Sequence, residues 1–189
     1  MVIHTNSPRA LEARRVNMEL ILSQHDNKCA TCIRSGTCQL QKIANDMGIL
    51  GVSYPTDLAR GKKADWTTTF PLYRDVNKCI KCMRCVAICE KVQHCAVWDF
   101  TGVGPSTKII VRDNLPIAEA GCALCGQCIT HCPTGALAAR DDVSLIMEAI
   151  LDPAVETVVQ VAPAVRTAWG EGLGLSREEA TPGRLAAAL

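Results

Sequence analysis

A cysteine-rich stretch at residues 78–90, KCIKCMRCVAICE, decides the fold of this chain, and it returns as GCALCGQCITHCP at residues 121–133. The two copies align cysteine for cysteine at an offset of 43 positions, and both follow the spacing C-x2-C-x2-C-x3-C. The chain of 189 residues has 12 cysteines but only 2 Phe, 2 Tyr and 3 Trp. Because aromatic side chains are too few to fill a large core, we expect cysteine chemistry to hold part of the fold together.

The spacing of both runs is typical of bacterial ferredoxins, in which three close thiolates bind one 4Fe–4S cluster and the fourth binds the neighbouring cluster. The two-residue gaps let a tight loop wrap the cluster, and we expect the fourth cysteine to begin a helix and to point away from that cluster. This rule predicts one cluster bound by Cys79, Cys82, Cys85 and Cys132. It predicts a second cluster bound by Cys122, Cys125, Cys128 and Cys89.

Two other interpretations of these runs are weaker. A structural zinc site normally uses two separated C-x2-C pairs. Each run here has three closely spaced cysteines, so such a pairing would leave some thiols without a role. A disulfide framework requires an oxidising compartment, and the start of the chain, MVIHTNSPRALEARR, lacks the apolar segment of a signal peptide. No stretch reaches 18 consecutive apolar residues, so no membrane span is expected. We therefore expect a reducing, cytoplasmic setting in which the cysteines bind metal.

A second pattern lies upstream, at residues 25–38, where HDNKCATCIRSGTC follows the spacing H-x3-C-x2-C-x5-C. Its four candidate ligands are His25, Cys29, Cys32 and Cys38. Three cysteines and one histidine also form a standard structural zinc site, so zinc is a stronger alternative here. The neighbouring ferredoxin-type runs favour a third 4Fe–4S cluster. A histidine in place of one thiolate removes a negative charge and is expected to raise the potential of that cluster.

The predicted fold class is α+β, in four parts. Residues 1–50 are expected to form a helical 4Fe–4S module, 51–70 a connector, 71–140 a two-cluster ferredoxin-like domain, and 141–189 a short αβ extension. Periodicity and capping residues predict helices over 8–24, 39–47 and 141–151, and the start of another at 163. Short strands are expected near 97–100 and 108–111, and a buried strand is expected over 156–162.

The charge of the chain argues against a bulk nucleic-acid binder, because the formal net charge is only +1. The first ferredoxin-type run carries basic residues such as Lys81 and Arg84, whereas the loop of the second run, GCALCGQC, is uncharged. We therefore expect the first cluster to have the higher potential or to face an acidic partner; an ordinary solvated loop is the alternative. With all twelve ligand places filled, Cys95 is expected to be a buried free thiol, and His94 and His131 match no ligand position.

The order of these motifs, followed by VAPAVRTAWGEGLGL at residues 161–175, resembles the electron-entry half of di-iron (iron-only) hydrogenases. The resemblance is closest to the large subunit of the multimeric, electron-bifurcating type. The pattern of one histidine and three cysteines is shared with the large iron–sulfur subunit of complex I and with soluble formate dehydrogenases. The segment APAVR is what favours hydrogenase.

The chain also departs from that family. No cysteine precedes Cys29, where the family usually has a plant-type 2Fe–2S domain, and none follows Cys132, where the family's active-site cluster is bound. We therefore expect no catalytic site in this chain. The resemblance implies a subunit with three 4Fe–4S clusters that relays single electrons within a hydrogenase-type complex, between a flavin- or NAD-linked iron–sulfur subunit and a separate catalytic subunit, with ferredoxin as a further candidate partner. A truncated catalytic hydrogenase, or a relay subunit of a formate dehydrogenase or complex I-like enzyme, is the alternative.

Overall fold

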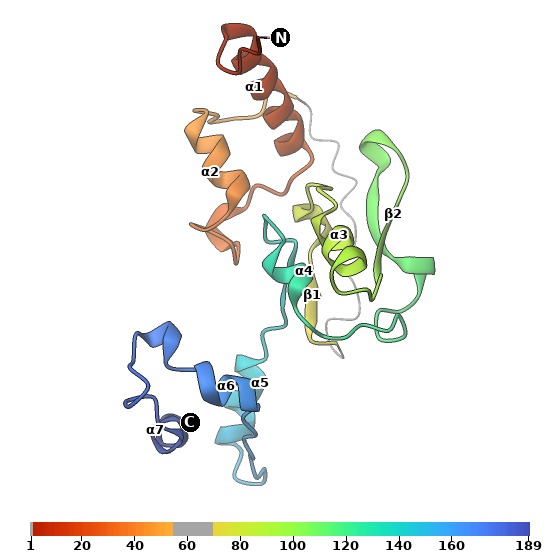
Figure 1. Ribbon diagram of the computed structural model, residues 1–189. Coiled ribbons are helices and arrows are strands. Elements are labelled where there is room, and N and C mark those ends of the chain that lie inside the picture. Colours follow the sequence, from red (N-terminus) through yellow and green to blue (C-terminus); the bar gives the residue numbers. More distant parts are fainter. Residues whose placement is uncertain (1, 55–69) are drawn as a thin grey trace. The chain divides into compact units, whose positions relative to one another are not determined.

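A computed structural model of the protein describes residues 2–54 and 70–189 (Figure 1). The chain divides into two compact units, Met1–Arg140 and Asp141–Leu189. Most of the predicted connector, residues 55–69, lies outside the described residues. No helix in the described ranges has both the length and the apolar character needed to cross a lipid bilayer.

The first part of unit Met1–Arg140 is a pair of helices around a cysteine-rich loop. Helix α1 spans Pro8–Ser23, and it begins as predicted, with Ser7 as the N-cap whose Oγ accepts a hydrogen bond from the Ala10 N–H at 3.3 Å. The 3-10 helix η1 spans Cys29–Thr31, and helix α2 spans Gln39–Asp46. Gly48 follows α2 with φ of +62°, the left-handed conformation that commonly ends a helix.

A small core holds these two helices together. It consists of buried side chains from α1, α2 and the residues that flank α2, namely Met18, Leu22, Cys38, Leu40, Ala44 and Ile49. The two helices predicted for this part of the chain are therefore present. Its long loop leads from α1 to α2 and contains all four predicted ligands.

The second part of this unit is a ferredoxin-like arrangement of two short two-stranded sheets and two helices. Strand β1 (Leu72–Arg74) pairs antiparallel with β4 (Leu137–Ala139), so that Leu72 lies opposite Ala139. Strand β2 (Trp98–Thr101) pairs antiparallel with β3 (Lys108–Val111). Helices α3 and α4 follow the two cysteine loops and span Arg84–Lys91 and Gln127–Thr130. The remaining 3-10 turns in this part are η3 (Val76–Lys78), η4 (Gly104–Ser106) and η5 (Arg112–Asn114).

The core of this part is built from strand and helix residues together with the cysteines. Trp98, Val97 and Ile117 are almost fully buried, and six of the predicted ligand cysteines pack around them or belong to the core. Strands β2 and β3 lie within one residue of their predicted positions. Strands β1 and β4 were not predicted, because three residues carry no readable alternation of apolar and polar side chains.

The expectation that the fourth cysteine of each run begins a helix was wrong. Cys89 lies inside α3, near its end, and Cys132 follows the end of α4. The helices begin one residue before the third cysteine of each run, because the preceding residue, Met83 or Gly126, has a left-handed backbone that turns the chain into the helix.

Unit Asp141–Leu189 contains helices α5 (Val143–Leu151), α6 (Pro163–Ala168) and α7 (Pro182–Ala188) and the 3-10 helix η6 (Glu171–Leu173). The predicted helices at 141–151 and from 163 are confirmed. The predicted buried strand at 156–162 was wrong: this segment has no regular structure, and residues 156–160 are exposed. A strand needs a neighbouring strand for its backbone hydrogen bonds, and the described residues 141–189 contain none. The extension is helical rather than αβ.

Candidate iron–sulfur sites

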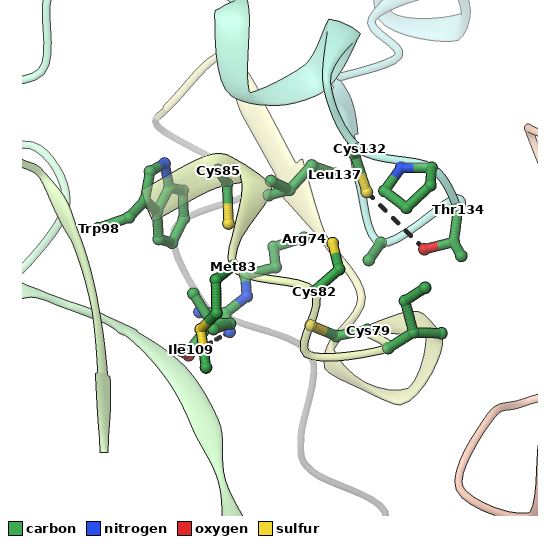
Figure 2. Close-up of a pocket in the computed structure, with 13 residues that line it drawn as sticks. Arg74, Cys79, Cys82, Met83, Cys85, Trp98, Ile109, Cys132, Thr134 and Leu137 are labelled. Atoms are coloured by element: carbon green, nitrogen blue, oxygen red, sulfur yellow. Dashed lines mark hydrogen bonds between the residues drawn. The ribbon is translucent and has the colours of Figure 1, made fainter. Parts of the chain in front are cut away.

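Four cysteines from both runs surround one hollow of about 410 Å³ in the ferredoxin-like part. They are Cys79, Cys82, Cys85 and Cys132, and Figure 2 shows their thiols around the same space. The rest of the wall is largely apolar, with Trp98, Ile109 and Leu137 among its residues. The apolar part of this wall shields whatever the thiols bind from water, and the exposed Cys82 marks the side at which the hollow is open.

A second hollow of about 330 Å³ is lined by Cys122, Cys125, Cys128 and Cys89. The Sγ atom of Cys89 also accepts a hydrogen bond from the backbone N–H of Val97 at 3.3 Å. Each hollow therefore gathers the first three cysteines of one run and the fourth cysteine of the other. The assignment of these side chains as ligands stays a prediction.

The backbone of the two cysteine loops repeats along with their sequence. Lys81 and Met83 have φ of 58° and 60°, and Leu124 and Gly126, 43 positions later, have φ of 54° and 69°. These left-handed residues let each loop wrap its hollow. The Lys81 and Leu124 N–H groups also donate hydrogen bonds to the thiols of Cys79 and Cys122, two residues earlier in each run. Such bonds favour the negatively charged sulfur.

Burial controls the protonation of these thiols. It raises the pKa of Cys85 to about 12, with a further contribution from the nearby Cys79 and Cys82 thiols. Burial likewise raises the pKa of Cys79, Cys122 and Cys128. Cys79, Cys85, Cys122 and Cys128 are therefore protonated when no metal is bound, and metal binding to them must release protons and supply positive charge. Four convergent thiols in a largely apolar wall fit a 4Fe–4S cluster, which is bound by cysteine thiolates.

The third group of predicted ligands lies in the loop between α1 and α2. His25 is buried, and its Nδ1 atom has no hydrogen-bond partner among the described residues. Burial lowers the pKa of His25, against opposing contributions from Asp26 and from a hydrogen bond to the Lys78 backbone. The imidazole is therefore kept neutral, which is the form that binds metal. A buried ring nitrogen without a partner is uncommon, and a metal ligand role would satisfy it.

The three cysteines of this group lie along the same loop. Cys29 begins η1, Cys32 directly follows its last residue, and the buried Cys38 is the N-cap of α2. Within residues 2–54 and 70–189, no three His, Cys, Asp or Glu side chains converge closely enough to hold a single metal ion. A 4Fe–4S cluster presents its four ligands to four separate iron atoms, so it requires a wider grouping than one ion does.

This loop is packed closely against the ferredoxin-like part. The Pro133 carbonyl accepts a hydrogen bond from the Gln39 N–H at 3.2 Å, and the Cys38 thiol lies 3.6 Å from the same oxygen. The Asp26 N–H donates to the Asn77 carbonyl at 2.9 Å. A Cβ added to Gly135 would lie 2.7 Å from the Sγ of Cys32. The first module therefore contacts the segment that follows Cys132.

The two basic residues singled out in the first run also take part in this contact. Lys81 Nζ donates to the side-chain oxygen of Gln24 at 2.7 Å, and Arg84 donates to that of Gln39 at 2.9 Å. Both glutamines belong to the first module. These cations therefore join the two parts of the unit.

Sequence patterns did not indicate three residues at the hollows. Arg74 and Trp98 line the first hollow, and Trp98 also lines the second. The buried Thr134 lines the first hollow and donates from its Oγ1 to the Lys78 carbonyl at 2.7 Å. Cys95, predicted to be a free buried thiol, is half-buried in the wall of the second hollow, and its thiol lies 3.4 Å from the Gln93 carbonyl. Only the spatial folding of β1 and β2 brings the first two of these to the cysteines.

Comparison with known proteins agrees with this geometry. Residues 14–52 match the family model of the NADH-ubiquinone oxidoreductase-G iron–sulfur binding region, and residues 78–136 match that of the 4Fe–4S dicluster domain. The whole chain is 39% identical over 189 residues to the NADP-reducing hydrogenase subunit HndD of Solidesulfovibrio fructosivorans, of which it covers 32%. The chain is related to the iron–sulfur electron-transfer regions of hydrogenase subunits. The two family models support 4Fe–4S clusters as the cofactors of this electron-transfer region.

Further relatives share the region but differ in what surrounds it. Over 140 residues the chain is 32% identical to the alpha subunit of NADPH-Fe(3+) oxidoreductase from Geobacter sulfurreducens, covering 73% of this chain and 16% of the relative. The fold is also that of a chain in the crystal structure of an NAD+-reducing NiFe-hydrogenase in the H2-reduced state, with a TM-score of 0.62 at 19% identity, covering 93% of this chain and 68% of that one. The chain thus spans about a third or less of the length of the two curated relatives, HndD and the NADPH-Fe(3+) oxidoreductase subunit.

Proposed function

We propose that this chain binds three 4Fe–4S clusters and relays single electrons within a cytoplasmic, hydrogenase-type complex. The observation that carries the proposal is the exchange of the fourth cysteines: Cys132 lines the hollow of the first run, and Cys89 lines the hollow of the second. This exchange is the arrangement by which bacterial two-cluster ferredoxins hold two clusters side by side. The third cluster would be held by His25, Cys29, Cys32 and Cys38.

The protein's own residues determine how such clusters would work. A bound 4Fe–4S cluster supplies a site that gains and loses one electron. Around it, the apolar walls exclude water, and the N–H groups of Lys81 and Leu124 hold negative charge on the sulfurs of Cys79 and Cys122. Both features act on reduction potential. Cys82 and Cys125 are exposed, so each hollow reaches the surface at its second cysteine, where a partner can approach.

The contacts also suggest an order for the three clusters. The loop with His25 and Cys38 packs against the segment after Cys132, which belongs to the first hollow. Trp98 is shared between the first and second hollows. The first hollow therefore lies in the middle of the path, with the module of His25 on one side and the second hollow on the other.

The proposed partners follow from the relatives. HndD is named as a subunit of an NADP-reducing hydrogenase, and the similarity to it extends through the C-terminal unit. We propose a flavin- or NAD-linked iron–sulfur subunit at one end of the relay and a hydrogen-converting site at the other, with ferredoxin as a further partner. A hydrogenase-type complex is preferred because the match to HndD extends over the whole chain at 39% identity, whereas the match to the NADPH-Fe(3+) oxidoreductase subunit covers 73% of the chain at 32% identity.

The test is metal analysis of protein purified without oxygen. We expect about twelve irons and as many sulfides per chain, as three 4Fe–4S clusters require, and EPR signals of reduced 4Fe–4S clusters. In Cys132→Ala we expect the cluster of the first hollow to be lost or damaged. Its matched control is Cys95→Ala, which removes a thiol from the second hollow and should retain all the iron. Zinc in place of iron, or loss of iron from Cys95→Ala but not from Cys132→Ala, would contradict the proposal.

A further inference from the structure

A buried arginine forms part of the wall of the first hollow. Arg74 lies in β1, is only 7% exposed, and lines the hollow beside Cys79 and Cys85 (Figure 2). Its guanidinium donates a hydrogen bond to the Ile109 carbonyl. Among the described residues, no carboxylate forms an ion pair with Arg74. A buried charge without an opposite charge is strongly unfavourable, so the fold implies that something negative occupies the hollow.

The arginine is held in place by a tryptophan that touches both hollows. The Arg74 guanidinium carbon lies 5.2 Å from the centre of the Trp98 ring, a cation–π contact. Trp98 is 2% exposed and lines the first and the second hollow. Its side chain also donates a hydrogen bond to the thiol of Cys128, which belongs to the second hollow. The two residues therefore form one connected group between the two sets of cysteines.

We propose that Arg74 and Trp98 are a tuning pair for the relay: Arg74 raises the potential of the cluster in the first hollow, and Trp98 raises that of the cluster in the second. This inference rests on the proposed function and adds residues that the cysteine motifs do not include. Neither residue is a ligand in it. Arg74 acts through its charge in the wall of the first hollow, and Trp98 acts through its hydrogen bond to the Cys128 thiol.

The physical reason is the charge that a cluster gains on reduction. A 4Fe–4S cluster with four thiolates is an anion, and the added electron makes it more negative. A fixed positive charge in a low-dielectric wall stabilises the reduced form more than the oxidised form, which raises the potential. A hydrogen bond to a ligand sulfur acts in the same direction. The cluster would in turn supply the negative charge that Arg74 lacks.

The experiment measures the reduction steps of the intact, cluster-loaded chain by anaerobic voltammetry and potentiometric EPR. Three variants are compared with wild type: Arg74→Gln, which removes the charge; Arg74→Lys, which keeps it; and Trp98→Phe, which keeps the ring but removes the N–H. We expect Arg74→Gln to move one step to lower potential and Trp98→Phe to move a different step to lower potential. Arg74→Lys should remain closer to wild type than Arg74→Gln does.

Arg112→Gln is the matched control, because Arg112 is a half-exposed arginine that pairs with Glu90 and Asp99 and is not part of either hollow's wall. If Arg74→Gln shifts no step further than Arg112→Gln, or if Arg74→Lys and Arg74→Gln behave alike, the charge is not what matters and the inference is overturned. If Arg74→Gln does not retain its cluster, Arg74→Lys decides: retention with a near wild-type potential supports the inference, and loss overturns it. A wild-type chain without 4Fe–4S clusters would instead refute the proposed function.

Discussion

The thiol of Cys38 lies 3.6 Å from the carbonyl oxygen of Pro133, although 95 positions separate the two residues in the sequence. Cys38 is a predicted ligand in the first module, and Pro133 directly follows Cys132, a predicted ligand in the ferredoxin-like part. The backbone N–H of Gln39, the residue after Cys38, donates to the same oxygen at 3.2 Å. The segment from Cys132 to Gly135 is therefore one of the places where the first module contacts the proposed middle of the relay.

The first prediction concerns Gly135 in that segment. An alanine there would place its Cβ 2.7 Å from the Sγ of Cys32, closer than atoms can approach without displacement. We expect Gly135→Ala to move the Cys32 thiol and to cost the first module its cluster, so that iron falls by about a third, or four of about twelve atoms. Gly51→Ala is the control, since its Cβ would meet nothing within 4 Å. Full iron content in Gly135→Ala would contradict the prediction, because it would mean that the added Cβ is accommodated without loss of the cluster.

A second prediction concerns the charge of the cluster in the first module. His25→Cys replaces a neutral ligand with a thiolate, which adds one negative charge to the cluster and disfavours its reduction. We expect the potential of one cluster to fall, on the order of 100 mV by comparison with the effect of histidine ligands in Rieske centres. Potentiometric EPR of the anaerobic protein measures it. The same change at the exposed His131 should leave every potential where it was, and an unchanged potential in His25→Cys would remove His25 from the ligand set.

The third prediction concerns the left-handed residues of the two cysteine loops. Gly126 has φ of +69° and open space around its missing Cβ, so an alanine there is unfavourable through backbone strain rather than through a clash. We expect Gly126→Ala to destabilise the cluster-loaded protein by about 1 kcal/mol. Anaerobic denaturation followed by the loss of cluster absorbance checks this. Gly51→Ala again serves as the control, because no left-handed φ is required there.

A fourth prediction follows from the composition of the ferredoxin-like core. Six of the cysteines pack around its buried residues, and burial raises the pKa of several of their thiols. Metal binding therefore contributes directly to folding. We expect removal of the clusters with a chelator to abolish amide protection across residues 71–139, as measured by hydrogen exchange. Reconstitution with iron and sulfide should restore it. A protected, cooperative core in the stripped protein would contradict the prediction.

Local patterns in the sequence were enough to predict much of the fold. The capping pair Ser7 and Pro8 predicted the start of α1, and strands were predicted within one residue of the observed β2 and β3. The predicted strand at 156–162 was wrong, although its residues have high β-propensity. A strand forms only where a neighbouring strand offers backbone hydrogen bonds, and whether one is present depends on the whole fold.

The candidate sites also combine features that the local sequence predicts with features that only the whole fold determines. Cysteine spacing is a local property, and it predicted which side chains the structure groups around each hollow. Arg74 and Trp98 reach the hollows only because β1 and β2 are brought together by the fold, and their sequence neighbours contain no sign of this. Likewise, the need for a glycine at position 135 comes from the close approach of the Cys32 thiol, and Cys32 lies about a hundred positions away in the chain.

The exchange of Cys89 and Cys132 between the two hollows has a consequence for how the protein is made. Neither half of the duplicated sequence supplies all four thiols that line one hollow, because each hollow takes its fourth thiol from the other run. A nascent chain that has emerged only as far as Cys128 holds the four thiols of the second hollow but only three of those of the first. Under the proposed ligand sets, neither cluster can be assembled on one run alone, and maturation of both depends on the two runs folding together.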